Sequence, residues 1–263
     1  MCFTPPVSPT AILFDFDGTL STLRHGWEKV MRPLMLEMID PQNPNNPALQ
    51  QEVDEYIDQS TGIQTVYQME WLAQKVAQHG KNPQVQDKWW YKEEYNRRLM
   101  KQVEQRIAQL ETGTVSPEAF LIEGSIPLLE RLKSTGVSLY VASGTDHDDV
   151  VREAKALGVA DYFAQILGAP RRQVSCSKEA VIRQLLGEKG FNGSELLVIG
   201  DGKVEIALGK EAGARTLGIA SDEERRRGIS PIKQRRLEQV GADWIIGDFA
   251  QLEKLLSWMG LTK

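Results

Sequence analysis

Two aspartates, Asp15 and Asp17, follow a short apolar segment near the start of the chain. Residues 11–14 are all apolar, which predicts a buried β-strand, and side chains two positions apart on a strand share one side. Two carboxylates placed in this way repel each other, and a divalent cation is the simplest group that neutralises them. Gly18 then permits a turn that other residues resist. The pattern fits a cation site, and it also fits an ordinary strand that ends in an Asp-Gly turn.

Downstream motifs decide between these interpretations. Asp-Phe-Asp-Gly-Thr, residues 15–19, is the first motif of the haloacid dehalogenase-like hydrolase superfamily, which this sequence resembles. The resemblance implies that Asp15 is a nucleophile that forms an aspartyl-phosphate and that Asp17 is the general acid and base. Asp17 also favours phosphoryl transfer over carbon–halogen cleavage, because a departing halide needs no proton and the dehalogenase branch lacks this second aspartate.

Ser143 and Gly144 follow the strand predicted over residues 137–142. The second family motif is a Ser or Thr at this position, so the resemblance implies that Ser143 binds the phosphoryl oxygens, with the backbone N–H of Gly144 as a further donor. A helix is predicted from Asp146, and Ser143 or Thr145 would also serve as its N-cap. On the residues alone the cap is the simpler interpretation, and only the order of the motifs supports phosphate binding.

Lys178 opens a helix predicted over residues 178–186. A cation in the first turn of a helix costs about 0.3–1 kcal/mol, and a bound phosphate would reverse that sign. The resemblance implies that Lys178 neutralises the nucleophile and the phosphoryl group. Relatives usually have Pro after this lysine, whereas this chain has Glu179. The alternatives for the role are Arg171, Arg172 and Lys203.

Asp201 closes the strand predicted over residues 196–199. The resemblance implies that it belongs to the fourth motif and holds Mg²⁺ together with Asp15 and the main-chain carbonyl of Asp17. Mg²⁺ keeps several waters, so few protein ligands suffice. Glu205 stands where relatives usually have a second Asp, and it could bind the metal directly, bind through water, or hold Lys178.

The elements that position these residues fall into two regions that differ in predicted secondary structure. Strand and helix patterns alternate from Glu123 onward, which predicts an α/β fold: a doubly wound, Rossmann-like parallel sheet whose ligand crevice lies at the carboxyl ends of its strands. Residues 23–120 show helical periodicity and no convincing strand. We therefore expect residues 1–22 and 121–263 to form the core and residues 23–120 to form an inserted all-α cap domain. The predicted strands are 11–14, 137–142, 163–167, 196–199, 215–219 and 244–246.

Composition excludes several classes of protein. The 263 residues are 41% hydrophobic and 25% charged, which is typical of a globular domain, and the net charge of −5 argues against a general surface for nucleic acid. No apolar run approaches the roughly 20 residues that span a bilayer. Two cysteines, Cys2 and Cys176, give no disulfide framework, and no signal peptide is evident, so a cytoplasmic location is expected.

One basic cluster remains. Acidic residues intersperse it, which favours a solvated helical face over a nucleic-acid site. The cluster comprises Arg225, Arg226, Arg227, Lys233, Arg235 and Arg236.

The sequence thus predicts a Mg²⁺-dependent phosphatase that hydrolyses a small phosphorylated metabolite, such as a sugar phosphate, through an aspartyl-phosphate. The resemblance places it near the phosphoglycolate phosphatase and β-phosphoglucomutase branches. A monomer or homodimer is expected, with neither nucleic acid nor membrane as a partner. Two alternatives stay open. One is a phosphomutase of the β-phosphoglucomutase type, and the other is a non-catalytic binding protein that retains the fold.

Overall fold

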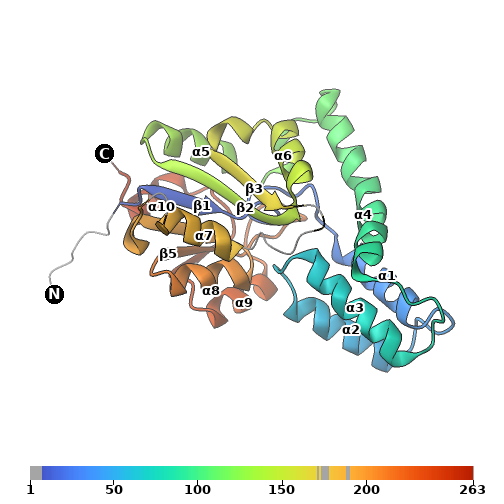
Figure 1. Ribbon diagram of the computed structural model, residues 1–263. Helices are drawn as coiled ribbons and strands as arrows, with labels where there is room; N and C mark the ends of the chain where they lie inside the picture. Colours follow the sequence, from blue (N-terminus) through green and yellow to red (C-terminus); the bar gives the residue numbers. More distant parts are fainter. Residues whose placement is uncertain (1–7, 171, 173–177, 188–189, 263) are drawn as a thin grey trace. The chain divides into compact units, whose positions relative to one another are not determined.

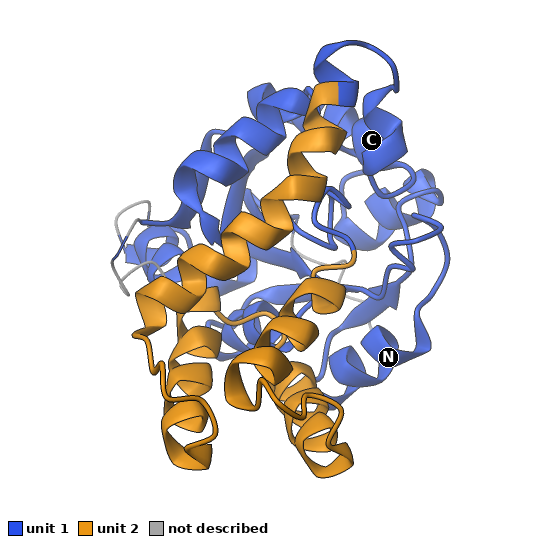
Figure 2. Cartoon of the chain, turned by 90° about the vertical axis from the view of Figure 1, so that its right-hand side faces the viewer, with its two compact units in different colours: residues 1–25, 109–263 blue, residues 26–108 orange. Residues whose placement is uncertain are grey.

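The chain divides into two compact units. The computed structural model describes residues 8–170, 172, 178–187 and 190–262. One unit, here called the core unit, contains residues 1–25 and 109–263, and the other, the helical unit, contains residues 26–108 (Figure 2). The helical unit is narrower than the predicted segment 23–120. The chain on either side of it belongs to the core unit, where the backbone N–H of Thr22 donates to the carbonyl of Phe120 at 2.8 Å.

The core unit is built on a parallel sheet, as predicted. The described residues form one six-stranded sheet in the order β3-β2-β1-β4-β5-β6, and every described pairing is parallel. The α/β fold class is therefore confirmed. The strands are β1 (Ala11–Phe14), β2 (Ser138–Asp146), β3 (Gln165–Ala169), β4 (Leu196–Gly200), β5 (Arg215–Ile219) and β6 (Trp244–Ile246).

Helices cover both faces of this sheet. Figure 1 shows α5 (Ser125–Ser134) and α6 (His147–Ala156) on one side and α7 (Lys178–Gly187) and α8 (Lys203–Glu211) on the other. The remaining helical segments of the core unit are α9 (Pro231–Gln239), α10 (Leu252–Met259) and the short 3-10 helices η1 (Pro117–Phe120), η2 (Ala160–Tyr162) and η3 (Gly193–Glu195).

Strand β1 is buried on both faces because it lies between β2 and β4. All four of its side chains are buried, and Ala11 and Leu13 pack in one apolar cluster with Val181 and Leu185 of α7. A continuous apolar run is the pattern of a strand covered on both sides. The chain order also reverses at β1, since β2 lies on one side and β4 on the other. A parallel sheet binds ligands beyond the carboxyl ends of its strands at such a switch point.

Strand β2 is longer than predicted, and this changes the setting of the second motif. The predicted strand ends at residue 142, whereas β2 continues to Asp146 after a register shift between Ala142 and Asp146. Ser143 and Gly144 therefore lie within the strand. Helix α6 begins at His147 with Asp146 as its N-cap residue, so the alternative in which Ser143 or Thr145 caps this helix is wrong.

The helical unit consists of helices joined by loops. Its elements are α1 (Glu28–Ile39), α2 (Pro47–Gln59), α3 (Thr65–His79) and most of α4 (Lys88–Glu111). Helix α1 packs against α2 and α3. Ion pairs fix α4 within the unit: Arg98 lies 2.7 Å from Glu37 of α1, and Lys88 lies 2.8 Å from Glu70 of α3. Among the residues that are described, no helix combines the length and apolar character needed to cross a membrane.

The packing of β1 makes a stability prediction. Leu13 is 1% exposed at the centre of the sheet, so Leu13→Ala should lower the free energy of unfolding by about 2–5 kcal/mol in urea denaturation. Ile232→Ala, at a side chain that is 54% exposed on α9, should change it by less than about 0.5 kcal/mol. Equal losses in the two variants would contradict the described core.

Candidate active site

Asp15 and Asp17 follow β1 but face different partners. Asp15 is buried directly beyond the strand, where its backbone N–H donates to the carbonyl of Ile199 at 2.8 Å. The Oδ2 atom of Asp17 accepts hydrogen bonds from Thr145 Oγ1 at 2.8 Å and from Ser143 Oγ at 3.4 Å. The first two motifs therefore meet at Asp17. Thr145, which the sequence analysis considered only as a helix cap, holds this carboxylate.

Lys178 lies beside Asp15, at the start of α7. Its Nζ is 3.1 Å from Asp15 Oδ1 and 2.7 Å from Glu205 Oε2. Burial alone would lower the pKa of Lys178, but Asp15 and Glu205 outweigh burial and raise it, so the ammonium form is held firmly. Of the alternatives for this role, Arg172 is exposed and Arg171 lies outside the described residues.

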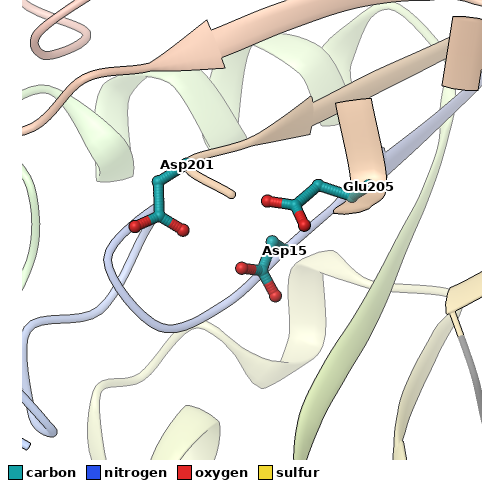
Figure 3. A group of neighbouring side chains, drawn as sticks. All are labelled: Asp15, Asp201 and Glu205. Atoms are coloured by element: carbon teal, nitrogen blue, oxygen red, sulfur yellow. The ribbon is translucent and has the colours of Figure 1, made fainter. Parts of the chain in front are cut away.

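Three carboxylates converge on one point beyond β1 and β4. Each of Asp15, Asp201 and Glu205 offers an oxygen, and these oxygens lie within 4.8 Å of one another. Figure 3 shows the side chains turned toward a common centre, with Asp201 coming from the loop after β4 and Glu205 from α8. The three residues belong to the first and fourth motifs, so the sheet brings together two groups that are far apart in the sequence.

Glu205 is occupied on both oxygens. Oε1 accepts the backbone N–H of Gly202 at 2.5 Å and closes the first turn of α8, and Oε2 accepts from Lys178 at 2.7 Å. Burial raises the pKa of Glu205, but Lys178 and the Gly202 N–H outweigh it and hold the pKa below its ordinary value. Of the three roles considered for Glu205, the contact with Lys178 is present, and the position of Glu205 beside Asp15 and Asp201 also fits a role at a metal ion.

The other acids carry an excess of negative charge. Burial raises the pKa of Asp15 well above its ordinary value, Lys178 opposes it, and the charges of Glu205 and Asp201 raise it further. Burial likewise raises the pKa of Asp201, against the attraction of Lys233. Hard oxygen donors with surplus negative charge are the ligands that Mg²⁺ prefers. The donor set therefore fits a divalent cation.

A second buried lysine lies at this cluster, and the sequence analysis missed it. Lys233 Nζ is 2.6 Å from Asp201 Oδ2, 2.6 Å from Glu223 Oε1 and 3.1 Å from Ser221 Oγ. Its side chain is 13% exposed, so its assignment to a solvated helical face is wrong. The available signal was Leu237, which is fully buried four residues further along α9 and so places Lys233 on the inward side of the helix.

The arginines of the same basic cluster have a different setting. The Arg225 side chain is 79% exposed. Arg225, Arg226 and Arg227 line a cavity of about 820 Å³ together with Glu118 and Glu224. Acidic and basic side chains thus both line this cavity, in keeping with the mixed charge of the sequence. The active-site carboxylates are not part of its lining.

Arg24 forms a further buried network next to Asp17. Its Nη2 lies 2.6 Å from Glu153 Oε1 and 3.4 Å from Asp149 Oδ2, and its Nε lies 4.0 Å from Asp17 Oδ1. Within the described part of the chain, this Oδ1 is buried and accepts no hydrogen bond. Burial raises the pKa of Asp17, while Arg24 and Thr145 oppose the rise. One oxygen of Asp17 is thus held, and the other is available for a proton.

Gly18 lets the acidic loop pass close to Asp201. Its φ of +75° is a conformation that L side chains rarely adopt. A Cβ added there would lie 2.3 Å from Asp201 Oδ2 and 2.9 Å from Lys233 Nζ. The Ser221 hydroxyl donates to the Gly18 carbonyl at 2.5 Å and fixes the loop from the other side. Glycine is therefore required here for both its backbone conformation and its lack of a side chain.

Comparison with known proteins identifies the class. The model of the haloacid dehalogenase-like hydrolase family matches residues 9–213, so the chain belongs to that family. Phosphoglycolate phosphatase of Yersinia pseudotuberculosis is 26% identical over 130 residues, which are 49% of this chain and 56% of that protein. The chain thus aligns with about half the length of the curated relatives that it matches.

Solved structures share the fold. A predicted phosphoglycolate phosphatase from Haemophilus somnus has a TM-score of 0.64 at 19% identity, covering 97% of this chain and 99% of that one. β-Phosphoglucomutase from Clostridium difficile has a TM-score of 0.61 at 15% identity, covering 96% and 97%. The assignment to the haloacid dehalogenase-like family, inferred from the four motifs, is therefore confirmed, and these two structures show that the fold is shared.

Gly18 provides a test of the site's packing. Gly18→Ala should lower the free energy of unfolding about 1–3 kcal/mol more than Gly136→Ala does. Both positions have positive φ, but only Gly18 faces Asp201 and Lys233. Nothing lies within 4 Å of the Cβ position at Gly136. Urea denaturation of the two variants gives the comparison, and equal losses would show that the close approach at Gly18 is absent.

Proposed function

We propose that this protein is a Mg²⁺-dependent phosphatase that hydrolyses a small phosphorylated metabolite, a sugar phosphate or similar monoester, through an aspartyl-phosphate on Asp15. The observation that carries the proposal is the contact of 3.1 Å between Lys178 Nζ and Asp15 Oδ1 at the switch point of the sheet, with Asp17 two residues further on. Membership in the hydrolase family and the names of its relatives support the same reaction class.

In the first step, an Asp15 oxygen attacks phosphorus and the bond from phosphorus to the leaving oxygen breaks. Asp17 gives its proton to that oxygen, which leaves as an alcohol. In the second step, Asp17 takes a proton from water as the water oxygen attacks phosphorus. The bond from phosphorus to Asp15 then breaks, inorganic phosphate leaves, and both aspartates return to their starting forms.

Asp17 is suited to carry this proton. Thr145 and Ser143 hold its Oδ2, while its Oδ1 is buried without a hydrogen bond among the described residues. Burial raises the pKa of Asp17, which favours a protonated carboxyl at the start of the cycle. Ordinary aspartate would be ionised near neutral pH and could not act as an acid.

Phosphoryl oxygens would be bound by Lys178, Ser143 and the backbone N–H of Gly144. Within the described part of the chain Lys178 Nζ contacts two acceptors, and an ammonium has three donors. One donor therefore remains for a phosphoryl oxygen. Ser143 Oγ accepts the backbone N–H of Thr145 at 3.1 Å, and its single O–H, which donates to Asp17 at 3.4 Å, would turn to a phosphoryl oxygen when substrate binds.

The residues that would hold Mg²⁺ are Asp15, Asp201 and the main-chain carbonyl of Asp17, and Glu205 is retained by Lys178. When bound, the cation supplies positive charge against the carboxylates and the phosphoryl oxygens.

The helical unit, residues 26–108, interrupts the core between the first and second motifs. We propose it as a cap that controls water and selects the substrate.

The structural likeness to a β-phosphoglucomutase keeps isomerisation as the second candidate, and analysis of the product distinguishes isomerised sugar phosphate from free phosphate. The presence of both Asp15 and Asp17 argues against a binding protein without turnover.

A cytoplasmic location is proposed because two cysteines give no disulfide framework.

Substitution of the nucleophile tests the reaction. Purified protein with Mg²⁺ and a panel of phosphorylated metabolites should release phosphate, and Asp15→Asn should reduce kcat/KM by at least ~10³-fold, about 4 kcal/mol of barrier. Asp54→Asn, at a carboxylate 51% exposed in the helical unit, should retain activity. Circular dichroism should show both variants folded. Undiminished turnover in Asp15→Asn would rule out the assigned nucleophile.

Substitution of the acid separates the two steps. Asp17→Asn should still react once with p-nitrophenyl phosphate, because nitrophenolate leaves without a proton, but it cannot activate water for the second step. Stopped-flow absorbance should therefore show a burst of nitrophenolate that approaches one equivalent of enzyme, followed by slow turnover. A slow, linear trace without a burst would mean that Asp17 acts elsewhere in the cycle.

A further inference from the structure

Lys233 has no place in the reaction described above, although it is buried at the same carboxylates. Its three contacts are with Asp201 Oδ2, Glu223 Oε1 and Ser221 Oγ, at 2.6, 2.6 and 3.1 Å. An ammonium has three N–H donors, so these acceptors use all of them. Lys233 therefore has no donor left for a phosphoryl oxygen while these contacts persist, in contrast to Lys178.

The position of the Lys233 ammonium affects the binding of a metal ion instead. Asp201 is the residue of the fourth motif, and its Oδ2 is the atom that Lys233 occupies. The other oxygen, Oδ1, accepts a long hydrogen bond of 3.4 Å from Thr19 Oγ1. A unit positive charge in direct contact with a ligand carboxylate repels a divalent cation bound to the same group. In a buried site this repulsion is poorly screened.

Glu223 provides a second support for the lysine. It lies 2.6 Å from Lys233 and 3.6 Å from His25 Nδ1, and its own side chain is 13% exposed. Burial raises the pKa of Glu223, but Lys233 and His25 outweigh burial and lower the pKa to about 2. The Glu223 carboxylate is therefore ionised. Together with Ser221, it can retain the Lys233 ammonium when Asp201 binds a divalent cation.

We propose that Lys233 competes with the divalent cation for Asp201 and so sets the affinity of the site for Mg²⁺, and that Glu223 and Ser221 retain its ammonium when the metal binds. This inference rests on the proposed function, in which Asp201 is a metal ligand. Lys233 acts through Asp201 and is thus a positioning residue. Its fixed charge lowers the affinity of Asp201 for Mg²⁺.

Metal binding, measured without substrate, tests this inference. Isothermal titration calorimetry with Mg²⁺ should show at least tenfold tighter binding to Lys233→Met than to the unsubstituted protein. Glu223→Gln removes the second support, leaves the lysine on Asp201, and should weaken binding several-fold. Lys210→Met is the matched control, since Lys210 pairs with Asp243 on the surface of the core unit and should leave affinity within about twofold.

A folding readout guards against misfolded variants. Lys233→Met without metal should have a lower melting temperature than the unsubstituted protein, because buried carboxylates lose their partner. Addition of Mg²⁺ should raise the melting temperature of Lys233→Met by more than it raises that of the unsubstituted protein. Lys233→Arg keeps the charge and should keep the weaker affinity.

Several outcomes would overturn the inference. Unchanged or weaker Mg²⁺ binding in Lys233→Met, with Asp201→Asn abolishing binding, would make Lys233 a support of Asp201 and leave the proposed function standing. Mg²⁺ binding that is unaffected by Asp201→Asn, or absent from all the proteins, would overturn both proposals. Tight binding in Lys233→Arg would show that charge is not the cause.

Discussion

The site depends on the burial of several carboxylates at one edge of the sheet, where each needs a positive partner. Removing charge from water is costly, and a buried ion pair is maintained only when geometry and hydrogen bonds compensate. Lys178 and Lys233 provide this compensation here, the first between Asp15 and Glu205 and the second between Asp201 and Glu223. The pKa of Asp15 and of Asp201 is nevertheless raised, so the lysines leave negative charge that a divalent cation can balance.

Topology produces this concentration of charge. Strand β1 lies between β2 and β4, and their carboxyl ends deliver Asp15, the Ser143–Thr145 segment and Asp201 to one place. The two lysines come from helices α7 and α9, which follow β3 and β5. Helices cover both faces of the sheet, which explains the continuous apolar run of β1. Gly18 is the point at which the loop after β1 closes against Asp201.

Much of this arrangement could be predicted because the relevant signals are local. Apolar runs that end in acidic or small residues located β1 and β4, and the order of the short motifs indicated the fold family. The end of β2 was harder to place, because Ser143-Gly144-Thr145 has the composition of a turn and a helix cap, yet it pairs with β3 through a register shift. Sheet pairing, which involves distant residues, prevailed over local preference.

The residues that balance the buried acids make long-range charge pairs. Lys233 meets Asp201 from 32 positions away, and Arg24 meets Glu153 from 129 positions away. No local pattern distinguishes Lys233 from the arginines near it, except that a buried Leu237 lies one turn further along the same helix. The four motifs therefore predicted the carboxylates and Lys178, whereas the groups that balance Asp17 and Asp201 required the folded chain.

The most direct test of the central claim is a crystal structure of the protein with Mg²⁺ and beryllium fluoride, whose trifluoroberyllate group mimics a phosphoryl group on a carboxylate. The account predicts that the group is bonded to an Asp15 oxygen, next to Lys178, with the cation at Asp15 and Asp201. A group bonded to Asp17, or an intact fold that carries no adduct on Asp15, would contradict the claim that the balanced carboxylate cluster makes Asp15 the nucleophile.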